Sequence, residues 1–218
     1  MIIKVCGLKE PENIKKVLKT SPDLVGFIFY QKSPRMVNEK ELSEWVEGNT
    51  ALFGETKRVG VFVDAKIDYV LNAIHDFQLD YIQLHGTESP EYCREIMDYW
   101  NFSSIRKAEI IKAFPVDENF DFSLTDIYSG ICSYYLFDTK TPKHGGSGEK
   151  FDWKILTEYL GDTPFLLSGG IAPEDAETIA KLQLSKMAGV DINSRFESAP
   201  GIKNVEEVAG FISKIKNN

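Results

Sequence analysis

The chain has 218 residues, of which 43% are hydrophobic and 27% charged, with a net charge of −8. This composition is typical of globular proteins and excludes collagen-like and disordered chains. The acidic balance argues against a nucleic-acid partner, and no apolar run approaches the roughly 18 residues that cross a membrane. Met1 leads directly into an apolar run without a basic leader, and three cysteines are an odd number. We therefore expect a cytoplasmic protein with reduced thiols and no membrane partner.

Short runs rich in β-branched and aromatic residues alternate with amphipathic stretches along the whole chain. The short runs predict strands, and apolar residues spaced i, i+3, i+4 predict helices. The predicted strands cover residues 2–7, 24–29, 59–63, 80–84, 110–114, 134–137, 164–167 and 186–190. Helices are predicted behind Pro11, over 41–46 and 67–74, from Pro90, over 151–159, from Pro173 and over 204–215, whereas 115–129 gives only a weak helical signal.

Eight strand-and-helix units of about 27 residues fill the chain, with no linker or composition shift between them. Such alternation also fits a doubly wound open sheet, because both folds contain apolar parallel strands. The count of eight favours an α/β fold with a single (β/α)8 TIM barrel over residues 1–218. In such a barrel the loops that follow the strands share one face, where active sites are found.

A thiol and a carboxyl group stand at two of these strand ends. Cys6 in isolation is more often a buried packing residue than a catalyst. Asp138 follows an apolar run, where a carboxylate costs desolvation unless it is paired or used. On strands one and six of a barrel, the two groups suit acid/base chemistry on a small molecule.

Two further side chains follow strands two and four. Arg35 is either an exposed charge or a bidentate partner for a substrate carboxylate. His85 is either a structural histidine or a hydrogen-bonding group of the site. The residues alone do not decide between the two alternatives, either for Arg35 or for His85.

Glycine-rich turns follow the late strands and suggest a phosphate site. Gly169 and Gly170 precede a helix that starts at a proline, Gly146 lies in the turn after strand six, and Ser194 follows strand eight. Glycine alone often merely ends a strand, but barrel enzymes frequently bind phosphate at the loops after strands seven and eight. Backbone N–H groups supply such a site, so an acidic protein accommodates it.

No metal or nucleotide cofactor is predicted. His75, His85 and His144 lack ligand spacing with cysteine or acidic partners. The GGSG segment at 145–148 lacks the lysine of a P-loop and does not match the dinucleotide fingerprint.

Taken in order, these motifs resemble the phosphoribosylanthranilate isomerase family of tryptophan biosynthesis. The matching segments are KVCG at 4–7, GFIF at 26–29, SPR at 33–35, VGVFV at 59–63, QLHG at 83–86, Asp138, GGSG at 145–148, FDW at 151–153, SGG at 168–170 and PG at 200–201. The resemblance implies a barrel that catalyses an Amadori rearrangement without a cofactor. It implies Cys6 as general base, Asp138 as general acid, Arg35 as a contact to the anthranilate, and Gly170 and Ser194 as phosphate-loop positions.

Two departures from the family pattern lie in the loops. Arg195 stands where the family usually has a glycine, which matters if the position needs a positive φ. The segment YQK at 30–32 alters the loop before Ser33.

Three alternatives stay open. The first is the related aminoaldose isomerase of histidine biosynthesis, a barrel whose acid and base are both carboxylates. The second is indole-glycerol-phosphate synthase, a barrel whose chemistry relies on Lys and Glu at the strand ends. A non-catalytic phosphosugar-binding protein is the third. Cys6 on strand one argues against the first, the Lys and Glu of the second have no match here, and the pair of Cys6 and Asp138 argues against the third. Monomer and homodimer are both compatible with the sequence.

Overall fold

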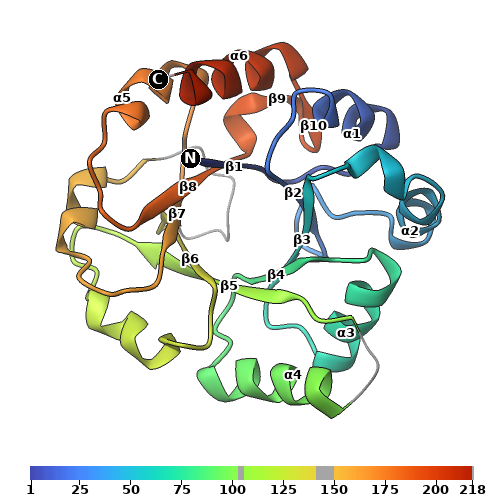
Figure 1. Ribbon diagram of the computed structural model, residues 1–218, viewed down its shortest axis with the longest axis horizontal. Coiled ribbons are helices and arrows are strands. Elements are labelled where there is room, and N and C mark those ends of the chain that lie inside the picture. Colours follow the sequence, from blue (N-terminus) through green and yellow to red (C-terminus); the bar gives the residue numbers. More distant parts are fainter. Residues whose placement is uncertain (103–105, 141–149, 218) are drawn as a thin grey trace.

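Eight parallel strands form a closed barrel in which each strand pairs with its neighbours in sequence and β8 pairs with β1 (Figure 1). The computed structural model describes residues 1–102, 106–140 and 150–217. The strands are β1 Ile2–Val5, β2 Leu24–Ile28, β3 Lys57–Phe62, β4 Tyr81–Leu84, β5 Glu109–Val116, β6 Tyr134–Thr139, β7 Phe165–Leu167 and β8 Met187–Ile192. The predicted (β/α)8 barrel is confirmed.

Helices surround the barrel on its outside, and α1 and α6 lie next to each other (Figure 1). The α-helices are α1 Pro11–Leu18, α2 Glu39–Gly48, α3 Ile67–Asp76, α4 Pro90–Phe102, α5 Ala176–Ala180 and α6 Val205–Lys216. The 3-10 segments are η1 Thr50–Phe53, η2 Phe122–Tyr128, η3 Trp153–Glu158, η4 Pro173–Asp175 and η5 Ser194–Phe196. Proline at the first position of α1 and α4 suits helix starts, where its missing N–H costs nothing.

The pleat of the strands divides the core into two layers. Apolar residues from β2, β3, β5, β6 and β7 form a cluster that contains no helical residue, so it fills the inside of the barrel. The larger cluster lies between the strands and the helices and includes Ile3 and Val5. Because successive side chains of a strand point to opposite faces, Ile2, Lys4 and Cys6 point into the barrel. Each fully buried Val or Ile contributes roughly 1.5–3 kcal/mol.

Several predicted boundaries are wrong, all near the ends of strands. β5 continues through Pro115, since proline removes only one donor and the ladder resumes where Lys140 N donates to Val116 O at 2.9 Å. β8 includes Asp191 instead of ending before it, and Asp138 lies inside β6. The expected loop up to Gly201 contains a short antiparallel pair, β9 Glu197–Ala199 and β10 Ile202–Lys203.

The segments that follow β5 and β6 and pack on the outside of the barrel are less regular than the predicted helices. The helix expected over 151–159 is the 3-10 segment η3, and the weak signal over 115–129 corresponds to η2. The side chains of Asp121 and Asp152 accept hydrogen bonds from the backbone N–H two residues later, so both segments begin with a local turn.

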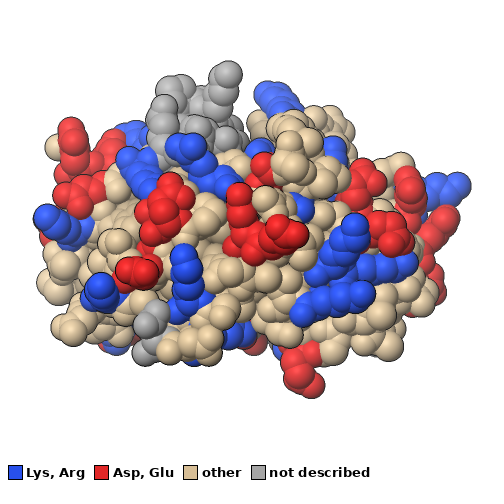
Figure 2. Space-filling view, turned by 90° about the horizontal axis from the view of Figure 1, so that it is seen from above, with Lys and Arg blue, Asp and Glu red and all other residues tan. Residues whose placement is uncertain are grey.

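On the face shown in Figure 2, acidic and basic side chains are interspersed, and no patch of one sign dominates. None of the described helices combines the length and apolar character needed to cross a lipid bilayer.

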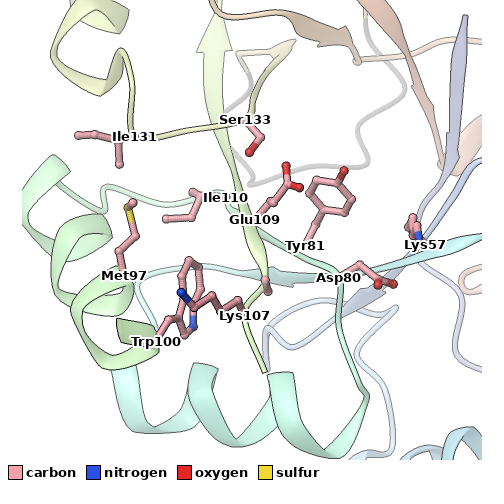
Figure 3. Close-up of a pocket in the computed structure, with 11 residues that line it drawn as sticks. Lys57, Asp80, Tyr81, Met97, Trp100, Lys107, Glu109, Ile110, Ile131 and Ser133 are labelled. Atoms are coloured by element: carbon pink, nitrogen blue, oxygen red, sulfur yellow. The ribbon is translucent and has the colours of Figure 1, made fainter. Parts of the chain in front are cut away.

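A cavity of about 430 Å³ opens at the end of the barrel where the strands begin (Figure 3). It is lined by the first residues of three strands, Lys57, Tyr81 and Glu109, and by Met97 and Trp100 of α4. The predicted site residues that the structure describes lie at the opposite end, where the strands finish. The cavity is therefore separate from the candidate site.

Candidate functional site

Cys6 lies directly after β1 and points into the mouth of the barrel, with only 3% of its surface exposed. Its backbone N–H donates to Ile192 O at 2.9 Å, which ties the thiol to the end of β8. Gly26 on β2 makes the space for the sulfur, because a Cβ at that glycine would lie 2.8 Å from Cys6 Sγ. The thiol therefore points into the barrel interior and not into the packed layer between the strands and the helices.

A buried ion pair lies one pleat below the thiol. Lys4 Nζ is 2.9 Å from Asp191 Oδ2, and the two side chains are 0% and 6% exposed. The Lys4 ammonium and the Cys6 thiolate also attract each other electrostatically. Burial by itself lowers the pKa of Lys4, but Asp191 and Cys6 together raise it above its ordinary value. Lys4 is thus a buried cation next to Cys6.

The surroundings of Cys6 act on its protonation in opposite directions. Burial raises the pKa of the thiol, and the charge of Asp191 adds to the rise. Lys4 and, more weakly, Lys203 oppose this effect because a cation stabilises the thiolate. Desolvation dominates in the absence of substrate, so the pKa stays above its ordinary value.

Asp138 lies on β6 and contacts His85, which directly follows β4, at the mouth of the barrel. His85 Nε2 is 3.3 Å from Asp138 Oδ2, and the side chains are 20% and 14% exposed. Gln83, one pleat below, places its Nε2 at 3.0 Å from His85 Nδ1. An amide nitrogen only donates, so Nδ1 accepts and the neutral ring carries its proton on Nε2, facing Asp138. His85 is therefore an oriented member of the site.

Arg35 reaches the mouth from the loop after β2. Its Nε and Nη2 donate to both carboxylate oxygens of Glu197 at 2.7–3.0 Å, and Lys203 Nζ donates to Glu197 Oε1 at 2.6 Å. Burial would raise the pKa of Glu197, but Arg35 and Lys203 lower it below its ordinary value. This cluster, Arg35, Glu197 and Lys203, joins the loop after β2 to β9 and β10.

Gly7 sits between the thiol and this cluster. Its φ is +76°, and a Cβ there would lie 2.6 Å from Asn193 Oδ1 and 2.8 Å from Arg35 Cδ. Only glycine allows both the left-handed backbone and this close approach. Arg35 is thereby held beside the residue that follows Cys6.

The predicted phosphate positions that the structure describes lie at the same end of the barrel. Gly169 and Gly170 follow β7 with φ of +90° and +61°, and Gly169 packs against Thr139 of β6. Ser194 begins η5 after β8, the strand next to β7. Gly146 lies outside the described residues.

Arg195 occupies the second position of η5, and its φ is not positive. The glycine expected there is thus not needed for the backbone, because the turn is a 3-10 helix that any residue adopts. Its side chain is exposed.

Several charged and polar residues of the site were missed in the sequence. Lys4, Gln83 and Asp191 lie inside strands, and Glu197 and Lys203 lie in a predicted loop. The available signal was the period of two: Lys4 and Gln83 are polar residues two positions before Cys6 and His85. A polar residue at an inward position of a buried strand requires a partner inside the barrel.

Comparison with known proteins agrees with this geometry. Residues 3–214 match the model of the N-(5'-phosphoribosyl)anthranilate (PRA) isomerase family. The chain belongs to the phosphoribosylanthranilate isomerase family.

Relatives of this isomerase family match over nearly their whole length. The N-(5'-phosphoribosyl)anthranilate isomerase of Parabacteroides distasonis is 45% identical over 99% of this chain and 93% of its own. That of Phocaeicola vulgatus is 39% identical over 99% of this chain and 98% of its own. The crystal structure of the Thermotoga maritima phosphoribosylanthranilate isomerase superposes with a TM-score of 0.84 at 31% identity, covering all of both chains. The fold, motif order and family assignment therefore agree.

Proposed function

We propose that this chain converts N-(5'-phosphoribosyl)anthranilate into 1-(2-carboxyphenylamino)-1-deoxyribulose 5-phosphate, with Cys6 as general base and Asp138 as general acid. Membership of the isomerase family supports the reaction. A phosphoribosylanthranilate isomerase that is 28% identical, with a TM-score of 0.79 and full coverage of both chains, has been solved with reduced 1-(o-carboxyphenylamino)-1-deoxyribulose 5-phosphate. The observation that carries the residue roles is the presence of a thiol beside a buried cation and a carboxyl group in one barrel mouth.

The rearrangement needs one proton donated and one removed. Asp138, protonated, donates to the furanose ring oxygen while the bond from that oxygen to C1 breaks, which gives a Schiff base between C1 and the anthranilate nitrogen. The Cys6 thiolate then removes the proton from C2, and the electron pair moves to form an enolamine. The enolamine tautomerises to the ketone, with a proton added at C1, so no atom is gained or lost.

The positive groups of the mouth fit the anionic substrate. Glu197 holds the Nε and Nη2 edge of Arg35, which fixes the plane of the guanidinium for the anthranilate carboxylate. Gly169, Gly170 and Ser194 offer backbone N–H groups to the phosphate at the neighbouring ends of β7 and β8. Gly146 belongs to the same proposal from its sequence alone. His85 orients Asp138 toward the sugar.

Cys6→Ala and Asp138→Asn test these roles. Incubation with freshly prepared phosphoribosylanthranilate, followed by the loss of its fluorescence, measures turnover. Loss of either group should lower kcat/KM by about 10²- to 10⁴-fold, which is roughly 3–5 kcal/mol of barrier. Near-normal turnover in either variant removes that residue from the mechanism.

Wild-type protein that fails to exceed the spontaneous rate would overturn the function itself. A separate turnover assay with the histidine-pathway aminoaldose, which carries no anthranilate and is followed by chromatography of its product, separates the two isomerases. The predicted cytoplasmic location and the monomeric or homodimeric state stay predictions. For comparison, the T. maritima enzyme is dimeric, and its engineered monomers superpose with a TM-score of 0.78 at 27% identity and full coverage of both chains.

A further inference from the structure

The ion pair of Lys4 and Asp191 is buried in the barrel, where the desolvation of two charges costs folding free energy. Both side chains are almost fully buried, and Asp191 Oδ1 has no hydrogen-bond partner among the described residues. Replacing a buried ion pair by uncharged residues of similar size is often neutral or stabilising. An orphaned buried acceptor adds a further cost. A contribution to folding stability therefore does not account for the presence of this ion pair.

The position of the pair relates it directly to the proposed base. Lys4 and Cys6 are two residues apart on β1 and point into the barrel together, and Lys4 is paired in register with Asp191 on β8. The ammonium is 2.9 Å from the Asp191 carboxylate, on the same inward face of β1 as the Cys6 thiol. A carboxylate that holds a cation beside a thiol keeps the charge at a fixed point.

The other groups around Cys6 do not supply this charge as directly. Lys203 of β10 is a second cation, but its Nζ donates to Glu197 and to Asn193 at 2.6–3.2 Å. Gly26 of β2 brings no charge, and the charge of Asp191 by itself opposes a thiolate. His85 and Asp138 lie across the mouth and contact each other.

We propose that Lys4 is a positioning residue that supplies the positive charge opposite the Cys6 thiolate, and that Asp191 holds it in place. This inference rests on the proposed role of Cys6 as the base and deepens it. Asp191 also interacts with Asp138, whose charge raises the pKa of Asp191 after the larger effect of burial.

The test uses Lys4→Met and the double variant Lys4→Met/Asp191→Asn. The single variant leaves a buried carboxylate unpaired and is open to misfolding, whereas the double variant removes both charges and keeps nearly the same volume. The first readout is the ultraviolet absorbance of the Cys6 thiolate as a function of pH, taken as the difference from Cys6→Ala. The second is the pH profile of kcat/KM.

We expect the thiolate midpoint to move to higher pH in both variants and further in the single one, because there Asp191 still opposes the thiolate. When the midpoint rises by about one pH unit, the thiolate fraction and kcat/KM at a pH below the midpoint fall about tenfold. The melting temperature of the double variant should stay equal to that of the wild type or rise. An unchanged thiolate midpoint in the double variant overturns the proposal.

A matched control lies on the outer face of β5. Lys112 Nζ is 3.1 Å from Glu88 Oε2, with side chains 3% and 1% exposed, but this pair does not face Cys6. Lys112→Met/Glu88→Gln should leave the thiolate midpoint in place, and a change as large as that of the Lys4 variants would overturn the specific role of Lys4. If Cys6→Ala keeps its turnover, the proposed base is wrong, while the thiolate titration still reports whether Lys4 acts on Cys6.

Discussion

Glu197→Gln removes the charge that joins Arg35 to Lys203. Its carboxylate accepts from Arg35 Nε and Nη2, from Lys203 Nζ and from the Gly201 backbone N–H, all at 2.6–3.1 Å. The Glu197 side chain is 4% exposed, and those of Arg35 and Lys203 are 10% and 0% exposed. Neutralising the carboxylate leaves two buried cations without their counter-charge.

The expected loss of unfolding free energy is about 3–5 kcal/mol, the range for removing one partner of a buried ion pair. Urea unfolding at neutral pH, followed by circular dichroism, measures it. A surface pair provides the control, because Glu12 Oε1 and Lys15 Nζ are also 2.7 Å apart but are 78% and 37% exposed. Glu12→Gln should give no measurable loss of stability.

The pH dependence of the Glu197 effect has a defined sign. The folded state lowers the pKa of Glu197 below its ordinary value of 4.5. Its contribution is therefore complete above the ordinary value and is lost as the pH falls through the lowered one. The stability gap between wild type and Glu197→Gln should narrow over that acidic range. A gap below ~1 kcal/mol at neutral pH, or one that stays constant into acid, would refute the account of this cluster.

Two further outcomes follow from the mouth of the barrel. Nitrogen NMR of histidine-labelled protein, with three histidines to resolve, should show that the neutral form of the His85 ring carries its proton on Nε2, and Gln83→Leu should relax that preference; a neutral wild-type ring protonated on Nδ1 would contradict the assignment. Gly26→Ala places a Cβ 2.8 Å from Cys6 Sγ and should cost about 1–3 kcal/mol of stability and lower kcat. Gly210→Ala on α6, where nothing lies within 4 Å, should stabilise by roughly 0.5–1 kcal/mol. Equal effects of the two alanines would contradict the steric explanation.

The barrel was predictable because short apolar runs alternate with amphipathic stretches eight times along the chain. The boundary errors have local causes. Pro115 suggests the end of a strand, yet it replaces one donor in a ladder that continues on both sides. The helix predicted after β6 is the 3-10 segment η3. Aromatic packing against Phe137, by Phe122 of η2 and by Tyr159 just after η3, holds these segments in place of an amphipathic stripe.

The predicted acid and base were placed by a strand-end argument, which the structure supports in position. The charges that surround Cys6 could not be found in that way. Lys4 and Asp191 are far apart in sequence and become neighbours only through the closure of the barrel between β1 and β8. Pairing between the first and last strands depends on the whole topology, which local pattern does not contain.

Some strands of the barrel are covered by α-helices and others by 3-10 segments, and this difference affects the mobility of the two proposed catalytic groups. β1, which precedes Cys6, is backed by the neighbouring helices α1 and α6, whereas β6 lies between the 3-10 segments η2 and η3. Leu124 and Ile127 of η2 are 55% and 60% exposed, so part of the apolar surface of this segment faces solvent. Segments with few buried contacts open at low free-energy cost. We expect the base to be held on the stiffer side of the barrel and the acid on the side that exchanges its amide hydrogens faster.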